Sequence, residues 1–190
     1  MTSNSQQIFL IRHGETEWSR TGKHTGLTDV ALTDEGKRQA AALGGALRGR
    51  KLSVWTSPLQ RARETARLAG FPSDQVDDDL REWDYGIYEG RTTLEIRQEN
   101  PEWSVWLSPI VNGESLIQVA ERARRVIDRV TASDSDVGLF AHGHILRILA
   151  ACWIGLPPIT GRYLALDTAT VSVLGYERQT RVIRHWNMTS

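Results

Sequence analysis

Two short, mostly apolar runs, far apart in the chain, are each followed directly by a His-Gly pair. Residues 8–11 lead into Arg12-His13-Gly14. Val137–Ala141 leads into His142-Gly143-His144. Apolar runs of this length are typical of buried strands in a parallel sheet. Because ligands of open α/β sheets bind outside the carboxyl ends of the strands, the two runs favour a sheet with a ligand site beside both histidine segments.

Strands and helices alternate along the rest of the chain. Further strands are predicted at residues 52–56, 75–80, 163–166, 171–176 and 181–186, the last two as a hairpin. Helices are predicted to begin after caps at Thr33, Ser57, Thr92 and Ser115, and a last helix runs from about His144 to Gly155. This alternation predicts an α/β fold, a three-layer α/β/α sandwich with a mostly parallel central sheet.

Size and charge narrow the class of protein. The 190 residues contain no repeats or linker-like segments, so a single domain over residues 1–190 is expected. Lys+Arg and Asp+Glu both count 23, and this balance disfavours a general nucleic-acid-binding protein. Residues 1–7 lack the basic and apolar regions of a secretory signal, and no apolar run approaches the roughly 20 residues that span a bilayer. We therefore expect a cytoplasmic protein with no membrane or nucleic-acid partner.

The single cysteine, Cys152, excludes an intrachain disulfide and a multi-cysteine zinc site. No metal and no other cofactor is expected. The sequence leaves the oligomeric state open, a homo-oligomer included.

Two further stretches complete the candidate site. Residues 57–61 place Arg61 in the first turn of a helix that follows a strand, and helix N-termini favour anions. Residues 82–86 place the carboxylates of Glu82 and Asp84 in a loop. If these stretches meet the two histidine segments at one sheet edge, they form a cationic pocket with an acid beside it. A fixed cation next to a nucleophilic imidazole indicates phosphoryl chemistry.

Six motifs occur in a fixed order over nearly the whole chain. They are Arg12-His13-Gly14-Glu15-Thr16, Thr25-Gly26-Leu27-Thr28-Asp29, Thr56-Ser57-Pro58 with Arg61 and Glu64-Thr65-Ala66, Glu82 with Tyr85-Gly86 and Glu89-Gly90, Gly113-Glu114-Ser115, and His142-Gly143-His144. Together they resemble the histidine phosphatase superfamily, in the branch that contains cofactor-dependent phosphoglycerate mutases and related phosphatases. The resemblance implies a phosphoglycerate mutase-like fold.

The resemblance also implies catalytic roles. His13 would be the nucleophile that forms a phosphohistidine, Arg12, Arg61 and His142 would surround the phosphoryl group, and Glu82 would be the proton donor. A neutral imidazole offers a lone pair near pH 7, and guanidinium groups match phosphate geometry and stay charged. Glu82 must be protonated to help the alkoxide leave and then ionised to activate water, so we expect an acidic to neutral pH optimum.

Several assignments stay open at this point. Asp84 is the alternative acid to Glu82. The substrate contacts implied by the resemblance are Ser19, Thr25, Gly26, Tyr85, Gly143 and His144. Ser19 stands where many mutases carry asparagine, and His144 either contacts substrate or hydrogen-bonds at a helix start. Trp18, Trp83, Trp103 and Trp106 form either an aromatic rim or part of the core.

The segment at residues 91–112 separates phosphatase from mutase. In mutases of the family, a long insertion here supplies basic residues and closes the site. This chain has only Arg91 and Arg97 in the segment, so water should reach a phosphohistidine. We expect a phosphatase of small phosphomonoesters, sugar phosphates included, with phosphoglycerate mutase as the alternative. Two other classes stay open: a metal site built on His142 and His144, and a non-catalytic phospho-ligand-binding module.

Overall fold

A six-stranded sheet organises the computed structural model, which describes residues 6–189. The strands follow the order β3-β2-β4-β1-β5-β6, with bounds β1 Ile8–Arg12, β2 Ser53–Thr56, β3 Gln75–Val76, β4 Val137–Ala141, β5 Val171–Glu177 and β6 Thr180–Met188. Strands β3, β2, β4 and β1 are parallel to one another. Strand β5 pairs antiparallel with β1, and β6 pairs antiparallel with β5. The prediction of a mostly parallel sheet is confirmed.

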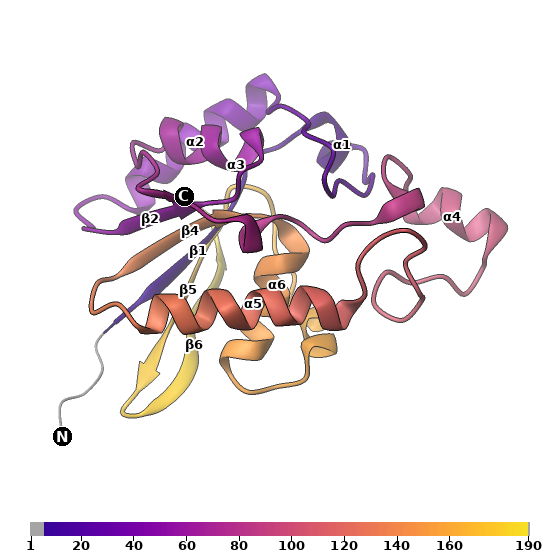
Figure 1. Ribbon diagram of the computed structural model, residues 1–190. Helices are drawn as coiled ribbons and strands as arrows, with labels where there is room; N and C mark the ends of the chain where they lie inside the picture. The colour runs from indigo at the N-terminus through magenta and orange to yellow at the C-terminus, as the bar shows by residue number, and fades with distance from the viewer. Residues whose placement is uncertain (1–5, 190) are drawn as a thin grey trace.

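Helices cover both faces of this sheet (Figure 1). On one face lie α2 (Asp34–Ala46) and α3 (Gln60–Leu68), and on the other lie α5 (Leu116–Thr131) and α6 (Gly143–Trp153). Alternate side chains of β1 enter the two cores: Ile8 and Leu10 pack with α5 and α6, whereas Phe9 and Ile11 pack with α2 and α3. A strand that is apolar on both faces therefore requires the predicted three layers.

The expected caps begin three of the helices. The Thr33 hydroxyl accepts a hydrogen bond from the N–H of Gly36 at the start of α2. Capping boxes at Thr92 and Ser115 begin α4 (Thr93–Glu99) and α5. A further capping box, which we did not predict, begins the short helix α1 (Glu17–Arg20).

Three local predictions are wrong. Helix α3 begins at Gln60 after Leu59, which has no side-chain cap; the Ser57 hydroxyl accepts the N–H of Leu59, ahead of the helix, and lies 2.7 Å from Nε2 of His142. Only two residues of 75–80 form a strand, since the Asp77 side chain accepts the N–H of Asp79 and turns the chain into η1 (Asp78–Leu80). Residues 163–166 are not a strand. They follow the 3₁₀ helix η3 (Pro158–Tyr163), and the carbonyl of Leu166 accepts a hydrogen bond from Arg12 rather than from a neighbouring strand.

Two glycines lock the loop after β1 against the start of α2. A Cβ atom on Gly14 would lie 2.3 Å from the carbonyl oxygen of Gly36. A Cβ atom on Gly36 would lie 2.0 Å from the carbonyl oxygen of Glu15. The backbones touch here, so only glycine fits at either position. This contact fixes the chain immediately after His13.

Within residues 6–189, no helix is both long and apolar enough to cross a membrane. Most of the polar N-terminal segment, for which we expected no secretory signal, lies outside the described residues. That expectation and the single-domain assignment stay predictions.

Candidate active site

His13 directly follows β1 at the carboxyl edge of the sheet. Its backbone N–H donates to the carbonyl of Ala141 at the end of β4, and its own carbonyl accepts from Ala169. The side chain is only 4% exposed. These backbone bonds continue the strand pairing on both sides, so the position of His13 is set by the sheet itself.

The hydrogen bond of His13 defines its tautomer. Nδ1 lies 2.7 Å from the carbonyl oxygen of Gly14, and a carbonyl can only accept. Nδ1 therefore carries the proton, and Nε2 keeps its lone pair. Burial lowers the pKa of His13 well below its ordinary value, and the charges of Arg61 and Arg12 lower it further. His13 is thus a neutral imidazole with an available Nε2.

Arg61, in the first turn of α3, is completely buried. Its Nη1 donates to the carbonyl of Thr28, and its Nη2 donates to the carbonyls of Thr25 and Gly26. These bonds hold the loop at residues 25–28 in place. Glu89 holds the same loop from the other side by accepting the N–H groups of Leu27 and Thr28.

His142 lies between Arg61 and Ser57. The Nε of Arg61 donates to Nδ1 of His142 over 3.1 Å, so Nε2 of His142 must carry the proton, which it donates to the Ser57 hydroxyl at 2.7 Å. Burial, followed by the charge of Arg61, lowers the pKa of His142 well below its ordinary value. The ring centroids of His142 and His13 are 5.2 Å apart. His142 is therefore a second neutral imidazole, of the opposite tautomer.

Arg12 has an unsatisfied donor. One Nη donates to the carbonyl of Leu166, but the buried Nε has no hydrogen-bond partner among the described residues. Burial lowers the pKa of Arg12, and the charge of Glu82 opposes that shift. An unpaired buried donor costs about 1–3 kcal/mol, which an anion placed beside it would offset.

Glu82 is 5% exposed and sits at the N-terminus of α6. Its Oε1 accepts the backbone N–H groups of Trp83 and Ile145, and its Oε2 accepts the N–H of His144. Asp84, the alternative acid, accepts the N–H of Gly86 and does not line the cavity. Of the two candidate acids, Glu82 is therefore the one that reaches the cavity.

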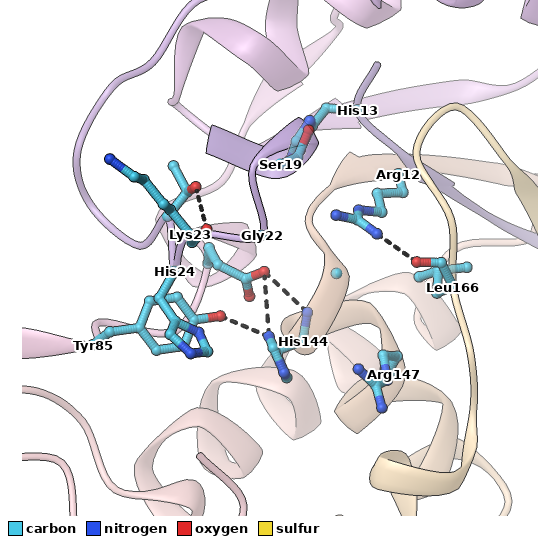
Figure 2. A pocket seen from close by; sticks show the side chains of 13 residues that line it. Arg12, His13, Ser19, Gly22, Lys23, His24, Tyr85, His144, Arg147 and Leu166 are labelled. Atoms are coloured by element: carbon cyan, nitrogen blue, oxygen red, sulfur yellow. Dashed lines mark hydrogen bonds and ion pairs between the residues drawn. The ribbon is translucent and has the colours of Figure 1, made fainter. Parts of the chain in front are cut away.

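These groups surround a cavity of about 200 Å³ (Figure 2). Of the residues predicted from the sequence, those that line it are Arg12, His13, Ser19, Thr25, Glu82, Tyr85, Gly143 and His144. Arg61 and His142 do not line the cavity, and both are completely buried. Gly26 does not line the cavity either. Its carbonyl accepts a hydrogen bond from Arg61, and a Cβ atom on it would lie 2.1 Å from Oε1 of Glu89.

Tyr85 and His144 form one wall of the cavity. The Tyr85 hydroxyl is 2.7 Å from Nδ1 of His144, whose backbone N–H bonds to Glu82. Burial raises the pKa of Tyr85 and lowers the pKa of His144, so both groups are neutral. His144 thus hydrogen-bonds at the helix start and also faces the cavity. Trp83 and Trp103 belong to the core, because each is almost fully buried.

Sequence reasoning missed five other residues that line the cavity: Gly22, Lys23, His24, Arg147 and Leu166. Lys23 and His24 directly precede the Thr25 motif, and Arg147 lies one helical turn after His144. Their distance along the chain from predicted site residues could have indicated that these three lie near the site. Leu166 had no such indication, because it contributes a backbone carbonyl.

The described residues contain no cluster of three or more His, Cys, Asp or Glu side chains that could hold a metal ion. His142 and His144, considered as a metal pair, are bonded to different partners, Arg61 and Ser57 for the first and Tyr85 for the second.

Comparison with known proteins decides the family. The family model described as histidine phosphatase superfamily (branch 1) matches residues 8–189. The chain belongs to this superfamily. The resemblance inferred from the sequence is confirmed, and the protein is a phosphatase, a phosphoric monoester hydrolase.

Three known proteins are similar to this histidine phosphatase in sequence or in structure. An acid phosphatase of Mycobacterium tuberculosis is 39% identical, over 100% of this chain and 96% of the relative. A sedoheptulose 1,7-bisphosphatase of Saccharomyces cerevisiae is 39% identical over 82% of this chain and 70% of the relative. The solved structure of open reading frame Rv3214 of Mycobacterium tuberculosis has 40% identity and a TM-score of 0.92, and the match covers 97% of this chain and 98% of that chain.

Gly143 generates a first prediction. A Cβ atom there would meet Arg12 at 3.5 Å and Glu82 at 3.7 Å, which are ordinary contacts, but the methyl group would enter the cavity between these two groups. We expect Gly143→Ala to leave Tm unchanged or higher, since alanine favours a helix, and to lower kcat/KM at least about tenfold by displacing the phosphoryl group. Gly45→Ala in α2, with no atom within 4 Å, is the matched control. Full activity of Gly143→Ala would show that the phosphoryl group does not bind beside Gly143.

Proposed function

We propose that the protein hydrolyses small phosphomonoesters through a phosphohistidine on Nε2 of His13. The observation that supports this most directly is the neutral, buried imidazole, whose Nε2 is not consumed by the Gly14 bond, on the wall of a cavity that also contains Arg12 and Glu82. A phosphoryl transition state spreads charge over three oxygens, so catalysis consists mainly of positioning and charge stabilisation.

The reaction has two steps. In the first, the Nε2 lone pair forms a bond to phosphorus while the ester P–O bond breaks, and the departing oxygen takes the proton of Glu82. In the second, the Glu82 carboxylate takes a proton from water, whose oxygen attacks phosphorus as the N–P bond breaks. Phosphate leaves, and His13 regains its lone pair. Because Oε1 of Glu82 already accepts two N–H groups, we assign the mobile proton to Oε2, which accepts one.

Arg12 and Arg61 supply the positive charge. We assign the unpartnered Nε of Arg12 to a phosphoryl oxygen. Arg61 acts from behind His13, where it lowers the pKa of the nucleophile and fixes His142 and the loop that contains Thr25. We keep His142 as a phosphoryl contact, reached if its Nε2–H turns from Ser57 toward the substrate.

The substrate is a small phosphorylated metabolite. A cavity of about 200 Å³ lies below the roughly 300–1,000 Å³ of sites for drug-sized ligands. The acid phosphatase and sedoheptulose bisphosphatase among the relatives support sugar phosphates as candidates. The proposed substrate contacts are Ser19, Thr25, Gly26, Tyr85, Gly143 and His144. We place this hydrolysis in the cytoplasm and in a single domain, and we leave a homo-oligomer open.

The segment at residues 91–112 favours hydrolysis over mutase activity. Arg91 is paired with Glu99, and the Nε of Arg97 donates to the carbonyl of Trp103. Neither guanidinium lines the cavity, so this segment adds no basic residue to the site.

The presence of both a nucleophile and an acid argues against a non-catalytic binding module.

Trapping the intermediate tests the proposal. After a rapid quench in base with ³²P-labelled substrate, we expect acid-labile label on the peptide that contains His13. His13→Ala should lack the label and lose activity by roughly 10³-fold or more. A chelator should leave the rate unchanged, and added 2,3-bisphosphoglycerate should not convert hydrolysis into phosphoryl exchange between substrates. Acid-stable label, label elsewhere, or full activity of His13→Ala would overturn the proposal.

The acid role of Glu82 predicts a dependence on the leaving group. We expect Glu82→Gln to lower kcat/KM for alkyl phosphates by about 10²–10⁴-fold, because an alkoxide needs a proton to leave. The aryl ester p-nitrophenyl phosphate should lose far less. The measured quantity is kcat/KM, which reports phosphorylation of His13 without the later water attack, and Asp84→Asn is the matched control. Equal losses on both esters would remove Glu82 from this role.

A further inference from the structure

The proposed acid, Glu82, lies in a segment without regular secondary structure. Residues 81–85 join η1 to the 3₁₀ helix η2 (Gly86–Tyr88) and belong to no helix or strand. Within the part of the chain that the structure describes, no backbone–backbone hydrogen bond involves residue 82 or 83. The N–H groups of α6 can orient the Glu82 carboxylate only while its backbone stays within their reach. That backbone therefore needs support from elsewhere in the fold.

Arg122, on α5, supplies this support through one guanidinium. Its Nη1 donates to the carbonyls of Asp79 over 2.7 Å and of Arg81 over 3.0 Å. Its Nη2 donates to the carbonyl of Glu82 over 3.4 Å. The three carbonyls belong to η1 and to the two residues that follow it. One side chain thus fixes the direction in which the chain leaves η1 and enters the segment of the acid.

Glu114 orients the same guanidinium and holds the other side of the segment. Its Oε1 accepts from Nε of Arg122 over 2.8 Å, and its Oε2 accepts from Nη2 over 2.7 Å, which makes a bidentate ion pair. Oε2 also accepts the backbone N–H of Asp84 over 3.1 Å. The N–H of Glu114 donates to the carbonyl of Asp84, and its carbonyl accepts from the indole of Trp83. Residues on both sides of Glu82 are therefore tied to the Arg122–Glu114 pair.

These bonds use all five N–H donors of Arg122. Its side chain is 12% exposed and that of Glu114 is 24% exposed, so solvent screens the pair weakly. The next arginine on this face of α5 is different: Arg125 is 52% exposed and binds the carboxylate of Asp79. Arg122 is thus a rigid bracket for backbone carbonyls, whereas Arg125 forms a surface ion pair.

We propose that Arg122 is a positioning residue for the acid, holding the backbone of residues 79–84 so that the Glu82 carboxylate stays at the N-terminus of α6 and faces the cavity. This inference rests on the proposed acid role of Glu82 and adds to it a residue that does not line the cavity. Proton transfer requires the acid within hydrogen-bond reach of the leaving oxygen. A displacement of about 1 Å can lower a rate about 10²-fold.

The leaving-group dependence of the rate tests the proposal. The measured quantity is the ratio of kcat/KM for an alkyl ester to kcat/KM for p-nitrophenyl phosphate. The alkyl ester is the one hydrolysed fastest among glycerol 3-phosphate, fructose 6-phosphate and 3-phosphoglycerate. We expect Arg122→Met to lower this ratio by about 10- to 100-fold, in the direction of Glu82→Gln, because only the alkoxide needs a well-placed proton. Because each ratio is measured within one preparation, partial unfolding of a variant cancels.

A double variant separates positioning from a general structural effect. In Glu82→Gln, no acid remains to be positioned, so adding Arg122→Met should leave the ratio of Glu82→Gln unchanged. Arg125→Met is the matched control on α5, because it removes an ion pair to Asp79 but no bond to a carbonyl, and it should keep the full ratio. Arg122→Lys keeps the charge without the planar fork and should retain part of the ratio.

Glu114→Gln provides a second route to the same measurement. It keeps the size of the side chain but removes the charge that orients the guanidinium, so the ratio should fall in the same direction. If Arg122→Met does not fold, the ratios of Glu114→Gln and Arg122→Lys decide.

An unchanged ratio in Arg122→Met, or in both substitutes where that variant does not fold, would overturn the proposal. A further fall of the ratio when Arg122→Met is added to Glu82→Gln would also overturn it, since Arg122 would then not act through Glu82. An unchanged ratio in Glu82→Gln itself would instead contradict the acid role. Loss of the label on His13 in the unaltered protein would contradict the proposed hydrolysis.

Discussion

The hydrogen bond from Nδ1 of His13 to the carbonyl of Gly14 is the constraint on which the site depends. It leaves Nε2 as the only nitrogen that can attack, and it requires the Gly14 peptide to stay where it is. Gln39 secures that peptide, because its Oε1 accepts the N–H of Glu15, and the Thr65 hydroxyl secures the preceding peptide by accepting the N–H of Gly14. The backbones of Gly14 and Gly36 are also in contact, which keeps the loop after His13 against α2. One imidazole is thus oriented by a sheet, two helices and a loop.

A second property of the site is that its opposite charges do not neutralise one another. Arg12, Arg61 and Arg147 donate mainly to carbonyls, and Glu82 accepts from backbone N–H groups. Away from the site the pattern reverses: Arg125 binds Asp79 in an ion pair of 2.6 Å, and Arg129 binds Asp77 in one of 2.7 Å. Cations bonded to neutral dipoles keep their charge available to the ligand, and their field adds to burial in lowering the pKa of His13. The substrate brings the compensating negative charge.

The sequence predicted the parts of this structure that depend on local patterns. The apolar runs of β1 and β4, the caps at Thr33, Thr92 and Ser115, and the order of the six motifs each follow from neighbouring residues. The failures involve distant partners. Ser57 is a typical cap residue, but its hydroxyl accepts the N–H of Leu59 ahead of the helix and lies against His142, 85 residues away. The carbonyl of Leu166 turns to Arg12, 154 residues away, so no strand forms there. Arg147 was not predicted at all, and the carbonyl that fixes its Nε, that of Gly161, lies 14 residues further along the chain.

The most direct test of the central claim is the protonation state of His13 itself. Nitrogen-15 NMR of protein labelled at histidine, with His13 assigned by its absence in His13→Ala, reports which ring nitrogen carries a proton. Between pH 5.5 and 7.5, at values spaced through the roughly 6.5 midpoint of an ordinary histidine, we expect a neutral ring protonated on Nδ1 throughout. A ring that becomes an imidazolium near pH 6.5, or one protonated on Nε2, would contradict the account.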